Sequence, residues 1–483
     1  MALCCASRDG HFTPRIAETL ESRFAEVVES QSEILAHHCT EAGLIEKAAG
    51  LWGKAGQRSL ERSAYVEAVE QLTRALVQIA TLPATPALRR DQITLQVALI
   101  TPLANVKGWG APETKAAVQR ARLLIQQAEA LGEPPEDPLL TFSVLYGSWV
   151  ANFVAFNGDV LRELAAQFLA LAEKQGATVP LTVGHRIMGI TLAFTGDFAG
   201  ALAHYDRSLA LYDPAEHRPL AARFGYDTRV TVLCWRALAS WVLGYPEKAL
   251  ADANHAVKDA REIGGAATLM LALAHTSVTH IVCGNYATAN ALLDELVVLA
   301  DGRRALFWKP QALSNKGSLL ALIGKAPESV QMINSGITAL RSTGATFFMP
   351  LHLSCLARAY AELGQFDDAW QSIDETMTAV ETTKERWWEA ETLRIGGEIA
   401  LMLPEPDAAK AEPYFERALV IAREQQAKSW ELRVAMSIAR LWCDRGKRDQ
   451  ARDLLAPIYG WFTEGFDTLD LKQAKGLLEE LAS

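Results

Sequence analysis

The segment Ala357-Arg-Ala-Tyr-Ala-Glu-Leu-Gly-Gln-Phe-Asp-Asp-Ala369 decides the fold of this 483-residue chain. Apolar residues before its glycine, and again after it, recur at the spacing of a helix. Glycine adopts positive φ without a steric penalty, so it suits the end of a helix. The segment therefore predicts two helices joined by a tight turn.

The same pattern recurs along the chain. Turns of this kind begin at Gly196, Gly244, Gly284, Gly324, Gly364 and Gly446, and the middle four glycines are 40 residues apart. Seven residues before a turn, or at the next step of 40, lie the small residues Ala237, Ser277, Gly317, Ala357, Gly397 and Ala439. A turn is missing at Pro404-Glu-Pro-Asp407, where an insertion of two residues restores the phase. The sequence therefore contains an internal repeat.

We interpret each repeat as a helical hairpin in which a small residue lets the second helix pack close to the first. Two helices cannot bury their apolar faces alone, so neighbouring hairpins must stack. The predicted fold class is all-α, a helical-hairpin solenoid or superhelix. Ala357, Tyr360, Gly364, Phe366 and Ala369 resemble the tetratricopeptide repeat, although a unit of 40 residues is longer than the usual one of about 34.

The regularity of the repeat divides the chain into four parts. We expect an unmatched segment at 1–14, tetratricopeptide-like hairpins at 15–80, irregular helical repeats at 81–160 and regular repeats at 161–483. Ser63, Tyr65 and Ala68 begin one of the early hairpins. The irregular part is predicted to hold helices at 89–106, 112–131 and 139–157. Each hairpin is expected to contact mainly its neighbours.

The composition limits the classes of partner and the cellular compartment that fit this sequence. The chain is 50% hydrophobic and carries a net charge of −10 without a basic run, which argues against binding of nucleic acid or of an anionic membrane. The uncharged stretches at 138–158 and 263–293 lack the flanks of a membrane span. Seven cysteines without a CxxC pair fit a reducing compartment, and no signal peptide is visible. We therefore expect a cytoplasmic protein.

Two further segments resemble one kind of repeat array. They are Ile34-Leu-Ala-His-His-Cys-Thr-Glu-Ala-Gly-Leu-Ile-Glu-Lys-Ala48 and Leu455-Ala-Pro-Ile-Tyr-Gly-Trp-Phe-Thr-Glu-Gly-Phe-Asp-Thr468, together with Gln425-Gln-Ala-Lys-Ser-Trp-Glu-Leu-Arg433. They resemble the tetratricopeptide tail of bacterial class III adenylate/guanylate cyclases that are fused to a signal-transduction ATPase. The resemblance begins near Arg15 and implies a regulatory module in cAMP signalling, whose partner is a protein or peptide segment such as a cyclase or ATPase module.

The catalytic parts of those fusion proteins are not recognised in this sequence. The Gly-Lys pairs at Gly53, Gly324 and Gly446 lack the pattern of a P-loop, and no α/β cyclase domain fits. We therefore predict no catalytic, cofactor or metal residues, and whether the chain is an enzyme stays open. The alternative implied by the resemblance is an adenylate cyclase, which would use ATP and Mg²⁺ or Mn²⁺. A third possibility is that the reading frame begins just past an ATPase, as part of a split or truncated fusion.

Several clusters admit two interpretations. His37-His38-Cys39 with Glu41 could bind a metal, but adjacent histidines point about 100° apart on a helix, which favours an ordinary surface. His275 and His280 could be ligands, but their spacing of five favours core or groove positions. The tryptophans could form a binding stripe, although packing between repeats is the more common role of large aromatic side chains.

The binding surface is predicted from geometry alone. Stacked hairpins curve, and the first helix of each hairpin lines the concave face. Because the arginines on that face come late in the chain, we expect an acidic or carboxylate-bearing partner segment there. The alternative is that these arginines are ordinary ion-paired surface residues. The candidates for the partner-binding groove are Trp241, Ile281, Ser314, Ser318, Arg358, Arg394, Arg433, Met436 and Arg440.

Overall fold

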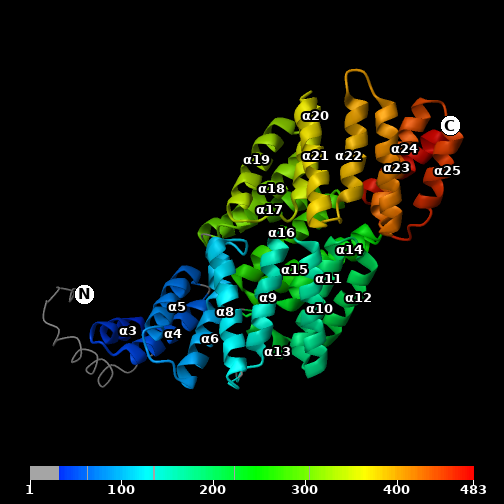
Figure 1. Cartoon of the computed structure of the whole chain (residues 1–483). Coiled ribbons are helices and arrows are strands. Elements are labelled where there is room, and N and C mark those ends of the chain that lie inside the picture. The colour runs from blue at the N-terminus through cyan, green and yellow to red at the C-terminus, as the bar shows by residue number, and fades with distance from the viewer. Residues whose placement is uncertain (1–31, 63, 134–135, 222, 304, 483) are drawn as a thin grey trace. The chain divides into compact units, whose positions relative to one another are not determined.

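The computed structural model describes residues 32–62, 64–133, 136–221, 223–303 and 305–482, and all regular structure in those ranges is helical (Figure 1). This confirms the predicted all-α solenoid. The predictions for residues 1–14 and for Ser63 lie outside these ranges. The described helices are too short or too polar to cross a membrane.

The chain forms two compact units. The first consists of 1–148 with 222–224, and the second of 149–221 with 225–483. The first unit contains α3 (Ser32–Glu41), α4 (Ile45–Glu61), α5 (Tyr65–Ile79), α6 (Pro86–Ala98), α7 (Ile100–Lys107), α8 (Pro112–Ala130) and the start of α9 (Leu139–Val154). The boundaries expected at 80 and 160 stay predictions.

The second unit consists of hairpins. Its helices are α10 (Gly158–Gln175), α11 (Thr178–Phe194), α12 (Phe198–Leu211), α13 (Pro214–His217), α14 (Thr228–Val242), α15 (Pro246–Ile263), α16 (Ala266–Val282), α17 (Tyr286–Gly302), α18 (Trp308–Leu322), α19 (Ala326–Ser342), α20 (Met349–Glu362), α21 (Phe366–Thr383), α22 (Glu389–Met402), α23 (Ala408–Glu424), α24 (Lys428–Asp444), α25 (Arg448–Tyr459) and α26 (Leu469–Ala482).

The turns between the paired helices form as the repeat predicts. All six turn glycines have positive φ, between 72° and 95°. In the turn after α20, the Gly364 and Gln365 N–H groups donate to the Ala361 and Tyr360 carbonyls, which would otherwise lack partners at the helix end. Glycine is needed here because other residues rarely adopt this backbone conformation.

The small residues bring paired helices together, as predicted. Ala237, Ser277, Ala357 and Ala439 are fully buried. A Cβ at Gly317 would lie 2.9 Å from the Ile333 backbone nitrogen. The backbone of α18 therefore packs directly against Ile333 of α19. The 40-residue spacing is therefore the spacing of close contacts between paired helices.

The irregular part differs from the prediction in one place. The helix expected at 89–106 is interrupted at Leu99, which separates α6 from α7. Pro102 has no N–H to donate to the Ala98 carbonyl, so an uninterrupted helix would lose that hydrogen bond. The other two helices expected in this part form as α8 and α9, with ends that differ by one to three residues.

Hairpins of the second unit contact mainly their neighbours, as the sequence predicts, but some contacts join hairpins that are far apart in the chain. The Phe347 N–H donates to the Val154 carbonyl and the Arg386 N–H to the Phe194 carbonyl. The Ser429 hydroxyl donates to the Trp241 carbonyl, 188 residues away along the chain. Hairpins α20–α25 therefore return to contact the turns of the earlier hairpins, so the superhelix closes on itself within this unit (Figure 1).

An aromatic cluster fills the space where the superhelix returns. Phe194 contacts Trp235, Phe348 and Trp387, with ring centroids 5.1–5.6 Å apart. Trp430 lies 4.6 Å from Trp241. All of these side chains are buried. This supports packing as the role of most large tryptophans, although Trp461 remains 38% exposed.

Candidate functional site

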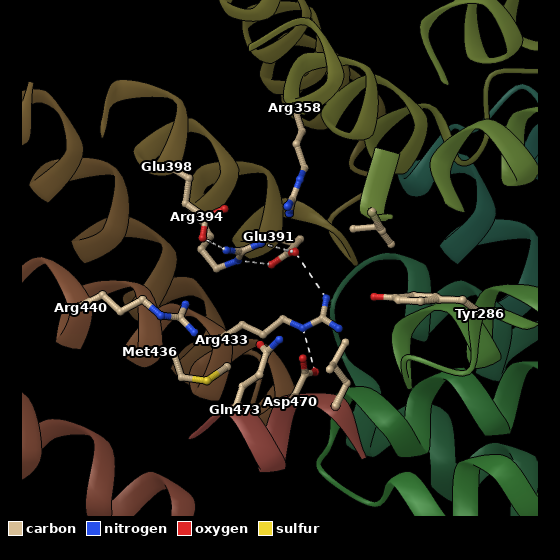
Figure 2. A pocket seen from close by; sticks show the side chains of 12 residues that line it. Tyr286, Arg358, Glu391, Arg394, Glu398, Arg433, Met436, Arg440, Asp470 and Gln473 are labelled. Atoms are coloured by element: carbon tan, nitrogen blue, oxygen red, sulfur yellow. Dashed lines mark hydrogen bonds and ion pairs between the residues drawn. The ribbon is translucent and has the colours of Figure 1, made fainter. Parts of the chain in front are cut away.

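A cavity of about 340 Å³ opens among α17, α18, α20, α22, α24 and α26 of the second unit (Figure 2). The first helices of three successive hairpins contribute its arginines, and α26 closes one side. We call this cavity the arginine pocket. It is lined by Tyr286, Leu322, Arg358, Glu391, Arg394, Glu398, Arg433, Met436, Arg440, Leu469, Asp470 and Gln473.

A buried carboxylate organises the floor of the arginine pocket. Glu391 is 2% exposed, and both of its oxygens accept hydrogen bonds of 2.7 Å from Arg394. Arg433 forms a third, longer ion pair with Glu391 at 3.4 Å. Arg394 also pairs with Glu398. This bidentate geometry fixes the guanidinium of Arg394 in place.

Arg433 joins three parts of the superhelix. Its Nε donates to Asp470 of α26 at 2.8 Å, and its Nη2 donates to the Val282 carbonyl at the end of α16 at 2.9 Å. Its guanidinium lies 5.0 Å from the Trp241 ring and 5.3 Å from the Trp430 ring. These contacts satisfy a charge that is largely removed from water.

The protonation states follow from these contacts. Burial by itself raises the pKa of Glu391, but the charges and hydrogen bonds of Arg394 and Arg433 outweigh it and lower the pKa below its usual value. For Arg433, burial lowers the pKa, and the opposing charges of Asp470 and Glu391 raise it above the usual value. Glu391 and Arg433 are therefore both charged at neutral pH.

The outer part of the pocket carries cations with fewer partners. Arg358 is about one-third exposed and pairs with Glu362 one turn further along α20, at 3.1 Å. Arg440 is exposed, and its guanidinium forms no ion pair with the described residues. Figure 2 shows both side chains reaching toward the network from different helices. Arg358 is matched by Glu362, so Arg440 is the guanidinium of the pocket lining that an added anion can pair with directly.

The structure brings five of the nine predicted groove residues together in this pocket. These are Arg358, Arg394, Arg433, Met436 and Arg440. Trp241 is buried beneath Arg433, and Ile281 is buried in a small apolar cluster that includes two lining residues, Tyr286 and Leu322.

Ser314 and Ser318 lie elsewhere. Both are fully buried in α18, and the Ser318 hydroxyl donates to the Ser314 carbonyl at 3.0 Å. In this structure they contribute to helix packing and do not line the pocket.

Sequence reasoning missed the carboxylates of the site. Glu391 and Glu398 lie three residues before and four residues after Arg394, so the ion-pair spacing of a helix could have indicated them. Asp470 has no such local signal, because it reaches Arg433 only through the return of α26. Tyr286 belongs to an earlier hairpin and was missed for the same reason.

The two histidine candidates of α16 lie in the packed core. His275 is buried with its ring centroid 4.1 Å from that of Trp235, and burial lowers its pKa to about 3, so it is neutral. His280 is also buried. Within the described ranges no group of three or more His, Cys, Asp or Glu side chains could hold a metal, which includes the His37–Glu41 segment.

Comparison with known proteins supports the repeat. The sequence model of the tetratricopeptide repeat family matches residues 182–207 and 350–369, which contain the turns at Gly196 and Gly364. The chain therefore contains tetratricopeptide-type repeats, with the register that the glycines define.

Two longer likenesses extend over most of the chain. It is 24% identical over 418 residues to an uncharacterized protein of Rhizobium meliloti, a match that includes 84% of this chain but 39% of the relative. The chain thus spans about two-fifths of the length of that relative. The crystal structure of a Rap protein complexed with Competence and Sporulation Factor has a TM-score of 0.56 at 12% identity, over 79% of this chain and 99% of that one. This second likeness shows a shared fold.

Proposed function

We propose that this chain is a non-catalytic interaction module that binds an acidic segment of a partner protein in the arginine pocket. One observation carries the proposal: Arg440 lines the cavity without an ion pair in the described chain, beside floor carboxylates that already have arginine partners. A partner carboxylate would bind Arg440 without displacing Glu391 or Asp470, and it would share Arg358 with Glu362. Planar guanidinium groups are well matched to carboxylates.

Two features favour a protein segment as the partner. The fold is a helical-repeat superhelix, and such folds present extended inner surfaces to other chains. The Rap protein with the same fold was solved in complex with Competence and Sporulation Factor, which is a precedent for ligand binding by this architecture. The pocket also offers apolar contacts through Met436, Leu322 and Leu469 beside the charges.

The resemblance of residues 34–48 and 425–468 to the tail of cyclase–ATPase fusion proteins suggests the setting. In that setting the module would act in the cytoplasm and regulate a nucleotide cyclase or an ATPase in cAMP signalling. Binding of an acidic segment would then depend on the conformation of the partner, or would hold the partner in one conformation.

The binding proposal is tested with a fluorescein-labelled glutamate-rich peptide and its glutamine counterpart. We expect the purified chain to bind the first more tightly, with an affinity that falls as salt is added. The variant R358A/R440A should weaken binding at least about tenfold. The matched control R229A/R261A removes two exposed, ion-paired arginines that do not line the pocket. Equal losses in both variants would contradict the proposal.

The regulatory role needs a separate test. A class III cyclase domain fused ahead of residue 15 should change its cAMP output when the glutamate-rich peptide is added. The change should disappear in the R358A/R440A fusion. If the peptide is shown to bind but the cAMP output does not change, the regulatory role is refuted. The proposed interaction module is not affected by that result.

The second candidate function, adenylate cyclase activity of this chain itself, rests on the resemblance alone. It predicts cAMP formation when the purified chain is incubated with ATP and Mg²⁺ or Mn²⁺. Our proposal predicts none. Robust activity that survives further purification would replace the interaction module with an enzyme.

A further inference from the structure

Backbone carbonyls at the ends of four helices accept hydrogen bonds from later parts of the chain: the last carbonyl of α9, α11 and α16, and in α14 the Trp241 carbonyl, one residue before the last. The Val154, Phe194 and Val282 carbonyls occupy the same place at the ends of α9, α11 and α16. Each accepts a hydrogen bond from a segment 151–193 residues later: from the Thr346 and Phe347 N–H groups at 2.8 and 3.1 Å, from the Arg386 N–H at 2.8 Å and from Arg433 Nη2 at 2.9 Å. The later layer thus covers the earlier turns and satisfies acceptors that a helix end leaves open.

The same place recurs in the next two hairpins without such a cover. It falls on Leu322 and Glu362, whose carbonyls receive no hydrogen bond from other parts of the described chain. The turn glycines show the same difference. A Cβ at Gly284 would meet Leu469 at 2.6 Å, whereas nothing lies within 4 Å of a Cβ at Gly324 or Gly364. The cover therefore ends between α16 and α18.

Apolar side chains are exposed where the cover ends. Ile323, Leu363 and Met402 are 40–42% exposed at the ends of α18, α20 and α22. Leu243 and Cys283 precede a turn glycine as Ile323 and Leu363 do, and in the covered turns they are 8% and 3% exposed. We call the turns at 322–328, 362–368 and 402–407 the open turn edge. In Figure 1 the loop from α22 to α23 stands free at the top of the picture.

The open turn edge is predominantly acidic. It carries one lysine, Lys325, and six carboxylates: Glu328, Glu362, Asp367, Asp368, Glu405 and Asp407. Only Glu362 is ion-paired within the described ranges, to Arg358. Each turn joins a helix C-terminus to a helix N-terminus, so the helix dipoles largely cancel and the carboxylates set the charge of the edge. The edge therefore combines hydrogen-bond acceptors, negative charge and exposed apolar side chains.

We propose that the open turn edge is a second docking surface, which binds a basic, aromatic segment of a partner protein. In the covered turns, backbone N–H groups, a hydroxyl and a guanidinium donate hydrogen bonds to the carbonyls at the helix ends. The same kinds of donor in a partner segment would suit the carbonyls of the open turn edge. Aromatic side chains accompany these donors, since Trp461 lies against Gly244 and Phe347 directly contacts Phe153. The negative charge selects cationic residues over acidic ones.

A second copy of the chain does not fit the edge equally well. The aromatic pairs within or beside the covering segments are Phe347-Phe348 and Trp387-Trp388, and Phe307-Trp308 holds the equivalent place one repeat earlier. All six aromatic side chains are buried within the unit to which they belong. A partner of different sequence is therefore the occupant that the structure supports. This surface is opposite in charge to the arginine pocket, so the two can bind different segments.

The test uses the full chain and a labelled peptide of lysine, arginine, tryptophan and phenylalanine. Two control peptides replace either the basic residues by glutamate or the aromatic residues by alanine. Fluorescence anisotropy should show binding of the first peptide and at least about tenfold weaker binding of each control. Equal binding of all three, or none, would overturn the proposal.

Variants locate the binding. I323S/L363S/M402S should weaken the basic, aromatic peptide at least about tenfold. The matched control V298S/V420S changes two other exposed apolar side chains, 73% and 55% exposed, and should leave the affinity within about twofold. R358A/R440A should not weaken binding of this peptide, which separates the edge from the arginine pocket. A loss confined to R358A/R440A would overturn the proposal.

Photo-crosslinking from a single substituted position tests the location of the binding without the triple substitution, which could fail to fold. A photo-crosslinking side chain in place of Leu363 should capture the basic, aromatic peptide, and the same group in place of Val298 should not. Capture at Val298 alone, or at neither position under conditions where anisotropy shows binding, would overturn the proposed location.

Discussion

Glu391→Gln tests whether the buried carboxylate holds the arginine pocket together. Glu391 is 2% exposed and accepts two hydrogen bonds from Arg394 and a longer contact from Arg433. Removing one partner of a buried ion pair costs about 3–5 kcal/mol. Because Arg394 keeps Glu398 and Arg433 keeps Asp470, we expect the lower end, about 3 kcal/mol.

Hydrogen exchange measured on peptides of α22 and α24 is the appropriate assay, since a chain with two compact units need not unfold in one step. A loss of about 3 kcal/mol corresponds to exchange roughly a hundredfold faster, because 1.4 kcal/mol is a factor of ten. The control Glu375→Gln breaks an exposed pair with Arg341 and should cost about 0–1 kcal/mol.

The pH dependence gives a second readout of the same carboxylate. The folded-state pKa of Glu391 is lowered, so its contribution to stability is present above the unfolded pKa and is lost as pH falls through the folded value. The difference between wild type and Glu391→Gln should therefore shrink in acid. Protection of α22 and α24 that matches the Glu375→Gln control at neutral pH would refute this reasoning.

Three further predictions concern the core. Burial raises the pKa of Glu385 to about 8, above the unfolded value of about 4.5, so stability should fall as pH rises between these values. Urea unfolding of Glu385→Gln should lack that fall, and an unaltered pH profile would contradict the prediction. Burial lowers the pKa of His275 to about 3, so its NMR signals should remain those of a neutral ring at pH of about 5 but titrate near 6.5 in urea; a folded-state titration near 6 would contradict it. Gly317→Ala should destabilise the protein by about 1–3 kcal/mol, because its Cβ would press on the Ile333 backbone. Gly476→Ala, with nothing within 4 Å, should stabilise α26 by about 0.5–1 kcal/mol. Thermal melts of both variants check this pair, and shifts in the same direction would contradict it.

The local architecture could be predicted from the sequence because it depends on short-range rules. A glycine with positive φ ends a helix, and a small residue seven positions earlier permits close contact with the next helix. Gly364 and Ala357 illustrate both rules. The same reasoning identified all four arginines of the pocket, since their helices follow one another at a nearly constant spacing.

The return of the superhelix could not be predicted in this way. It depends on small rotations between hairpins that add up over about five repeats, and the sequence pattern contains no measure of them. The partners of Arg433 show the consequence, because Asp470 and the Val282 carbonyl come from distant parts of the chain. Ser314 shows the converse error, since the rotation buries a position that the hairpin pattern placed in the groove.

The two proposed surfaces suggest how one module could hold a partner at two points. The arginine pocket offers cations within a cavity, and the open turn edge offers carboxylates and apolar side chains at the ends of the same helices, α18, α20 and α22. Opposite charge would keep each segment of a partner from binding at the other place.

The most direct test of the central claim is a crystal structure of the chain with the glutamate-rich peptide bound. We predict a peptide carboxylate within hydrogen-bonding distance of Arg358 and Arg440, above an intact Glu391–Arg394–Arg433 network. A peptide bound elsewhere, with the arginine pocket holding only solvent, would contradict the account.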